Sequence, residues 1–157
     1  MPYRSCEKPN NDKSDTAMSP LDELEDNPAP EGQLMLKLVA TPQDTNLHGD
    51  ISAGWVISQM EQAAELAAAR LAHGRTATVS VNSMDFLCPV RTGSLVQIHT
   101  QLMETGNSSM KFNVEVWILP PNERDEATLY KVTEAVFVMV ALDEKGRIRT
   151  LPATNGH

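Results

Sequence analysis

The sequence has no long hydrophobic run, and this absence argues against a membrane-spanning helix. The longest unbroken apolar stretch, residues 135–142, has eight residues, whereas a membrane span needs about 18 or more. No apolar stretch follows the charged residues at the N-terminus, so we also expect no secretory signal. A membrane is therefore not among the predicted partners.

Positive charge and cysteine are scarce as well. The chain has 13 Lys and Arg against 21 Asp and Glu, which gives a formal net charge of −8. Because nucleic-acid-binding surfaces are basic, this balance argues against nucleic acid as a main partner. The two cysteines, Cys6 and Cys88, match no metal-binding or redox spacing, and a reducing, cytoplasmic location is expected. His48, His73 and His99 also lack metal-ligand spacing, so no metal is predicted.

The length and composition predict a single folded domain preceded by an acidic, proline-rich segment. The 157 residues, 41% of them hydrophobic, suffice for one core and leave little room for two. Residues 1–33 contain five of the ten prolines and eight acidic residues against three basic ones. Such a segment buries too little apolar surface to offset its ordering entropy. We predict a disordered acidic N-terminal tail over residues 1–33, a folded domain over 34–152 and a C-terminal tail over 153–157.

Hydrophobic periodicity predicts one long helix from Ser52 to Ala72. Its apolar residues recur every three or four positions, as they do on the buried face of a helix. These residues are Val56, Met60, Ala63, Ala67 and Leu71. Asp50 or Ser52 can cap the start, and Gly74 lies where the helix would end.

Alternating apolar residues predict five strands around this helix. They are Leu34–Val39, Thr76–Phe86, Leu95–Met103, Ser109–Leu119 and Leu129–Leu142. The mostly short links between the last four favour antiparallel pairing. One helix on one face of such a sheet makes an α+β domain. Apolar residues remain on the uncovered face, so we expect a partner chain.

The junction between the first strand and the helix is the most informative stretch for chemistry. Gly49 and Gly54 permit another molecule to approach the backbone closely, and the N–H groups of a helix start can polarise a carbonyl. Asp50 lies beside them, where it could activate a water molecule. From the pattern alone, an aspartate that only caps the helix is the commoner case.

Glu61 is the second carboxylate of interest. A single glutamate on a helix is usually solvated or salt-bridged. Eleven residues separate Glu61 from Asp50, a distance of roughly 16 Å along a helix. The two carboxylates could therefore share a reacting centre only across a dimer interface, with two helices antiparallel about a two-fold axis.

Other candidate groups carry weaker signals. The turn Gly106–Ser109 joins two strands and is typical of a hairpin, although its hydroxyls and N–H groups could also hold phosphates or amides. Cys88 is interpreted as a small buried residue rather than a nucleophile, and no Ser-His-Asp set is visible. Arginines such as Arg147 and Arg149 could contact an anion but are interpreted mainly as surface charges.

The junction residues Asp44-Thr45-Asn46, Gly49-Asp50-Ile51 and Gly54-Trp55 resemble those of the YciA-type hotdog-fold acyl-CoA thioesterases. Three later stretches agree with that family in order and spacing. They are residues 79–89 with Ser83-Met84 and Phe86, then Gly106-x-Ser108-Ser109 leading to Val114-Glu115-Val116-Trp117, then Gly146-Arg147-x-Arg149-Thr150-x-Pro152. The resemblance covers residues 34–152 and leaves the N-terminal tail outside.

The resemblance implies a hotdog fold, in which a curved antiparallel sheet wraps around one long central helix. It implies dimers with two active sites at the interface, commonly assembled into hexamers as trimers of dimers. The implied reaction is hydrolysis of acyl-CoA to free CoA and a carboxylic acid, without a cofactor.

On matching positions, the resemblance assigns catalysis to Asp50, as general base or nucleophile, and to Glu61 of the other chain. The backbone N–H of Gly54 would polarise the thioester carbonyl. The predicted substrate- and CoA-binding residues are Asn46, His48, Gly106, Asn107, Ser108 and Ser109.

Three departures from the family pattern leave the acyl preference open: Ala53 replaces a usual glycine, His48 a usual asparagine and Glu61 a usual aspartate. Two other functions stay open at this point. One is a non-catalytic acyl-CoA sensor, which the presence of Asp50 and Glu61 disfavours. The other is a dehydratase acting on hydroxyacyl thioesters, which only His48 near Asp50 supports.

Overall fold

The computed structural model describes residues 29–125 and 127–153. Most of the predicted tail, residues 1–28, and most of the predicted C-terminal tail, residues 154–157, lie outside the described residues. Within the described part, the first strand begins at Gln33, one residue before the expected start of the domain.

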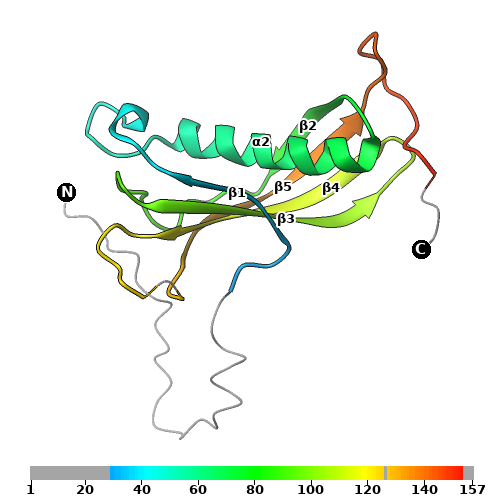
Figure 1. Ribbon diagram of the computed structural model, residues 1–157. Helices are drawn as coiled ribbons and strands as arrows, with labels where there is room; N and C mark the ends of the chain where they lie inside the picture. Colours follow the sequence, from blue (N-terminus) through cyan, green and yellow to red (C-terminus); the bar gives the residue numbers. More distant parts are fainter. Residues whose placement is uncertain (1–28, 126, 154–157) are drawn as a thin grey trace, which may run out of the picture.

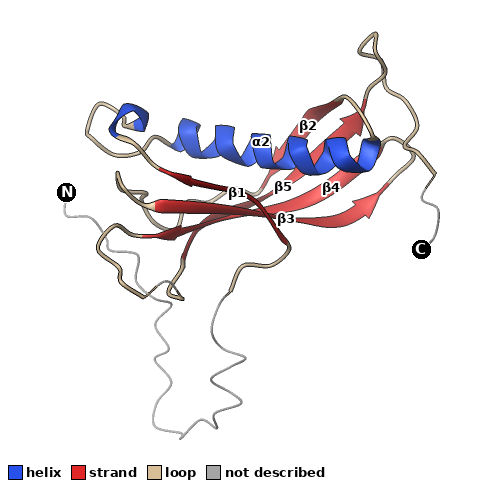
Figure 2. Cartoon of the chain, in the orientation of Figure 1, coloured by secondary structure: helices blue, strands red, loops and turns tan. Residues whose placement is uncertain are grey.

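The described chain forms one antiparallel sheet with one long helix across it (Figures 1 and 2). The strands pair in the order β1-β3-β4-β5-β2, and every neighbouring pair is antiparallel. Their bounds are β1 Gln33–Val39, β2 Thr76–Asn82, β3 Leu95–Thr105, β4 Ser109–Leu119 and β5 Tyr130–Ala141. The helix α2 spans Ala53–Ala72, and a short 3-10 turn η1 spans Pro42–Asp44. This is the α+β arrangement that the sequence pattern predicts and the hotdog fold that the family resemblance implies.

The strand predicted over Thr76–Phe86 is wrong at its end. Strand β2 stops at Asn82, which pairs with Val136 of β5, and Ser83 then adopts a left-handed backbone with φ of 58°. A left-handed residue breaks the extended geometry of a strand. The following residues therefore leave the sheet and turn toward the start of α2, a bend that β-propensity does not reveal.

The structure decides between the two candidate caps of the helix. The Oγ atom of Ser52 accepts a hydrogen bond from the backbone N–H of Trp55 at 3.1 Å, so Ser52 is the N-cap. Asp50 is not the cap. At the other end, the left-handed residue is His73 with φ of 54°, rather than Gly74.

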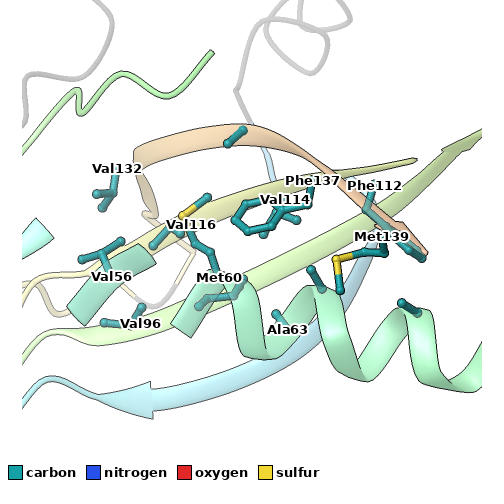
Figure 3. Packing of buried hydrophobic residues seen from close by; sticks show 14 of the residues in the cluster. Val56, Met60, Ala63, Val96, Phe112, Val114, Val116, Val132, Phe137 and Met139 are labelled. Atoms are coloured by element: carbon teal, nitrogen blue, oxygen red, sulfur yellow. The ribbon is translucent and has the colours of Figure 1, made fainter. Parts of the chain in front are cut away.

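The core lies between α2 and the inner face of the sheet (Figure 3). Met60 of the helix and Phe137 of β5 are both fully buried there. Four alanines make up most of the remaining buried face of the helix: Ala63, Ala64, Ala68 and Ala72. Because alanine side chains are short, the helix axis can lie close to the sheet.

The outer face of the sheet carries a buried charged group. Glu115 of β4 is only 4% exposed, and it accepts hydrogen bonds from the N–H of Glu31 and from Nε1 of Trp117, each at 3.0 Å. Lys131 Nζ lies 3.5 Å from Glu115 and 2.8 Å from Glu134. The hydrogen bond from Lys131 lowers the pKa of Glu134. This network holds residues just before β1 against the sheet.

Arg149 stabilises the C-terminal end of α2, and this role leads to a prediction. Its Nη2 donates to the carbonyl of Ala72 at 2.6 Å, and its Nε donates to the carbonyl of Leu142 at 2.9 Å. Since hydrogen bonds to charged groups contribute about 1.5–3 kcal/mol, we expect Arg149→Ala to lower the free energy of unfolding by about 2 kcal/mol in urea denaturation at fixed protein concentration.

Arg147 is the matched control for that prediction. Its side chain is 71% exposed and contacts Asp143 in an ion pair of 3.4 Å. Exposed ion pairs contribute about 0–1 kcal/mol. Arg147→Ala is therefore expected to lower the free energy of unfolding much less than Arg149→Ala does. Equal losses from the two substitutions would contradict the capping role of Arg149.

Candidate active site

The loop before α2 is organised around the side chain of Asn46. Its Oδ1 accepts hydrogen bonds from the backbone N–H groups of His48 at 2.8 Å and Asp50 at 3.1 Å. Gly49 closes the turn with φ of 83° and donates to the carbonyl of Asn46 at 3.1 Å. An amide at position 46 and a residue that tolerates positive φ at position 49 therefore shape the loop that carries Asp50.

Two further backbone hydrogen bonds attach this loop to the rest of the domain. Ser52 N donates to the carbonyl of Asp44 at 3.1 Å, and Ile51 N donates to the carbonyl of Val90 at 3.3 Å. Thr45 and Ile51 also form an isolated antiparallel bridge. Asp50 is thus held on both sides by ordered backbone.

Asp50 has an unsatisfied oxygen. Its Oδ1 atom is buried and has no hydrogen-bond partner among the described residues. Because a buried polar atom without a partner is costly, such an atom in a folded protein calls for an explanation, and a catalytic role is one. An aspartate that only capped the helix would point its oxygen at a backbone N–H, whereas here Ser52 makes that contact.

The first turn of α2 presents free donors next to open space. Within the described part of the chain, no hydrogen bond uses the N–H groups of Ala53 and Gly54, whereas the N–H groups of Trp55 and Val56 bond to Ser52. Gly54 is exposed, and a Cβ built on it would meet nothing within 4 Å. A carbonyl oxygen can therefore approach these N–H groups without a clash from this chain.

Glu61 does not meet Asp50 within one chain. It lies exposed on α2, eight residues after the first helical residue, which corresponds to about 12 Å of helix. Gly54, Ser58, Glu61 and Glu65 follow one another at helical spacing, and all four are exposed. This exposed stripe of the helix extends away from the Asp50 loop.

The turn Gly106–Ser109 lies at the opposite end of the helix from Asp50 (Figure 1). It is a hairpin closed by a bond from Gly106 N to Ser109 O at 2.9 Å, and the carbonyls of Asn107 and Ser108 accept from Leu151 N and Ala141 N. Arg149, in the same C-terminal stretch, contacts the last residue of α2. The 20-residue helix is about 30 Å long, so one chain does not bring this turn to Asp50.

The sequence-based prediction of the site missed an apolar hollow at the start of α2. It has a volume of about 320 Å³, and its walls come from Ile51, Ala53 and Val56 at the helix start and from residues 86–90. The available signal was the unbroken apolar composition of residues 86–90 between two strands. That segment reaches the helix start because of the bend at Ser83.

The described residues form neither a metal-binding cluster nor a membrane-spanning helix. No group of His, Cys, Asp and Glu in that part of the chain could hold a metal ion. No helix in it is long and apolar enough to cross a membrane.

Comparisons with known proteins place these features in context. A family model described as the thioesterase superfamily matches residues 48–124. An uncharacterized acyl-CoA thioester hydrolase of Haemophilus influenzae is 44% identical over 79% of this chain and 80% of its own length. The acyl-CoA thioester hydrolase YciA of Escherichia coli is 42% identical over 78% of this chain and 93% of its own.

Solved structures agree with these relatives. The chain is similar to a hexameric broad specificity acyl-coenzyme A thioesterase, HI0827, with a TM-score of 0.78 and 41% identity. That match covers 83% of this chain and 88% of the other. Because the match covers most of both chains, the similarity extends over most of the domain rather than a fragment of it.

Proposed function

This chain belongs to the YciA-type acyl-CoA thioester hydrolases and is an acyl-CoA thioesterase, and we propose that Asp50 is the carboxylate that acts on the thioester. The observation that supports this most directly is the buried Oδ1 of Asp50, which has no hydrogen-bond partner among the described residues, beside the open first turn of α2. The carboxylate of Asp50, the N–H donors of the first helical turn and open space for a substrate therefore lie next to one another. Substrate and product are acyl-CoA and free CoA with a carboxylic acid.

The Gly54 N–H would donate a hydrogen bond to the thioester carbonyl oxygen and stabilise the negative charge that develops on it. With Asp50 as general base, its carboxylate removes a proton from water, and the hydroxide attacks the carbonyl carbon. The carbon–sulfur bond then breaks, and the CoA thiolate takes the proton from Asp50. With Asp50 as nucleophile, its carboxylate attacks the carbonyl carbon, the carbon–sulfur bond breaks and the CoA thiolate leaves. Water then hydrolyses the resulting anhydride, which releases the carboxylic acid and regenerates the Asp50 carboxylate.

The site is proposed to be completed by a second copy of the chain. Strand β2 is at the edge of the sheet, and its Val79 and Val81 are 55% and 41% exposed. Two copies paired about a two-fold axis there, with antiparallel helices, would bring Glu61 of one chain toward Asp50 of the other. The same pairing would bring the turn Gly106–Ser109 toward the CoA, and Asn46 and His48 would line its approach.

Assembly beyond the dimer and the remaining assignments follow the same proposal. Hexamers among similar structures support a trimer of dimers. We assign residues 34–152 to the catalytic domain, with an acidic tail over residues 1–33 before it and a short C-terminal tail over residues 153–157 after it. The proposed chemistry uses no cofactor. We further propose a cytoplasmic hydrolase whose partners are acyl-CoA and copies of itself.

The test is release of the CoA thiol from a panel of acyl-CoAs, followed with a thiol reagent. A thioesterase releases thiol in proportion to the acid formed. Tight binding of acyl-CoA with no thiol release would instead indicate a sensor. A dehydratase would instead remove one water molecule, a loss of about 18 mass units, from a hydroxyacyl-CoA and leave the thioester intact.

A further inference from the structure

Strand β5 has an edge that β2 does not cover. The pairing of β2 with β5 ends at Asn82 and Val136, whereas β5 begins at Tyr130. Backbone groups at an uncovered edge lack ladder partners and stay available to other segments. Residues 83–90, which follow β2 without regular secondary structure, continue along this edge.

Two short hydrogen bonds attach this segment to β5. The N–H of Leu87 donates to the carbonyl of Val132 at 2.7 Å, and Oγ1 of Thr133 donates to the carbonyl of Asp85, also at 2.7 Å. Asp85 and Leu87 are exposed, so burial does little to fix the segment at these two residues. Its position there depends on the two hydrogen bonds, one of which comes from a side chain.

A β-bulge lies at the point of attachment. Val116 and Trp117 are neighbours on β4, but their partners on β5 are Thr133 and Lys131, so Val132 is an extra residue. A bulge changes the direction of nearby side chains, and bulges are frequent beside active sites. Here the bulged residue and the one after it are the two that bond to the segment.

Thr133 is completely buried, although its side chain carries a hydroxyl. A buried hydroxyl is costly unless it forms a hydrogen bond, and the bond to Asp85 satisfies this one. Valine is also branched at Cβ and would fill the same space without needing a partner. What the hydroxyl contributes at this position is therefore the attachment of the segment rather than packing.

The other end of the segment is bonded to the Asp50 loop. The carbonyl of Val90 accepts a hydrogen bond at 3.3 Å from the N–H of Ile51, the residue after Asp50. Val90 and Ile51 are both buried, and Pro89, whose ring fixes its φ angle, precedes Val90. Because this connection consists of hydrogen bonds and restricted backbone, a shift of the segment at Thr133 is passed on to the backbone that carries Asp50.

We propose that Thr133 is a positioning residue for thioester hydrolysis. Through residues 83–90 it fixes the Asp50 carboxylate relative to the N–H groups at the start of α2. Thr133 acts through its bond to the segment and not on the substrate. A misplacement of about 1 Å can lower a rate about 10²-fold, so a single remote bond can control turnover. The proposal rests on the proposed function of Asp50.

The first test compares Thr133→Val with Thr133→Ser in thiol release from the acyl-CoA that the wild type cleaves fastest. Thr133→Val removes the hydroxyl. We expect kcat to fall at least about tenfold and KM to stay within about twofold, because Asp50 is displaced while the contacts to CoA remain. Thr133→Ser keeps the hydroxyl, so its kcat should stay within about threefold of wild type.

Thr100→Val is the matched control. Thr100 is also buried, but it lies on β3, which β4 separates from β5. Loss of its hydroxyl should leave kcat within about twofold of wild type, because it does not hold the segment.

Pro89→Gly tests the same connection without altering a core strand. Glycine adds backbone freedom just before Val90. We expect kcat to fall at least about threefold, again with little change in KM. This variant also gives the answer if circular dichroism shows that Thr133→Val does not fold.

A double-mutant cycle shows whether Thr133 acts through Asp50. In the Asp50→Asn background, Thr133→Val should lower the residual turnover by less than about twofold, because no carboxylate remains to be positioned. A loss of folded protein would instead lower turnover by the same factor in both backgrounds.

The outcomes separate this inference from the proposed function. Normal kcat in Thr133→Val or Pro89→Gly, an equal loss in Thr100→Val, or equal losses from Thr133→Val in both backgrounds would overturn the positioning role and leave the thioesterase standing. Near-normal turnover of Asp50→Asn would overturn the proposed role of Asp50 and this inference with it.

Discussion

Asp50→Asn is expected to lower kcat for acyl-CoA hydrolysis by about 10²–10⁴-fold, the range for loss of a general base. The amide keeps the shape of the side chain but can neither accept the proton of water nor attack the thioester. KM should change less than kcat, because the contacts to CoA are unaltered. Thiol release at saturating acyl-CoA measures the effect.

A matched substitution at another aspartate distinguishes the loss of charge at the proposed site from a general effect on the fold. Asp143 also lies in a turn, where its Oδ1 accepts backbone N–H groups from Lys145 and Arg147 at 2.9 Å. Because Asp143 lies outside the proposed site, Asp143→Asn should leave kcat within about twofold of wild type. The Asp50→Asn variant should keep a wild-type circular dichroism spectrum. If Asp50→Asn retained near-normal turnover, Asp50 would not be the catalytic carboxylate.

Mixing two inactive variants is expected to restore about a quarter of wild-type activity. Asp50→Asn and Glu61→Gln should each fall below about 1% of wild-type turnover on its own. In a random mixture half of the dimers carry one copy of each variant. If each site takes Asp50 from one chain and Glu61 from the other, one of the two sites in a mixed dimer is intact.

The physical reason for this prediction is the geometry of one chain. Glu61 lies about 12 Å along the helix from its start, on the exposed stripe that extends away from the Asp50 loop. Co-expression of the two variants at equal levels, followed by thiol release per mole of protein, gives the measurement. Co-expression of Asp50→Asn with itself under two tags is the control. A mixture no more active than its parents would show that the two carboxylates do not combine across the interface.

Local sequence predicted the regular elements well because their signals are local. The period of apolar residues gave the long helix to within one residue of Ala53–Ala72, and strict alternation gave β4 as Ser109–Leu119. Where a prediction failed, a backbone angle was responsible. Ser83 has a side chain compatible with a strand, yet its left-handed conformation ends β2 early.

The candidate site also combines features that local sequence predicts with features that only the structure shows. Asp50, Gly54 and the loop glycine could be predicted from residue type and order, since a helix start offers N–H donors whatever surrounds it. The assignment of the N-cap to Ser52 rather than Asp50 needed coordinates, because both residues have capping side chains. Arg149 resembled a surface charge, and only its bonds to Ala72 and Leu142 show that it stabilises the end of the helix.

The sequence by itself determined the element order and the α+β class, because these depend on side-chain type and on spacing along the chain. The proposed roles of Asp50 and Gly54 came from the family resemblance. The tertiary structure decided what lies together in space. It left Oδ1 of Asp50 without a partner among the described residues, placed the turn Gly106–Ser109 at the far end of the helix, and brought residues 86–90 to the helix start as a cavity wall. Such contacts join residues distant in sequence, and a periodic pattern carries no information about which distant residues will meet.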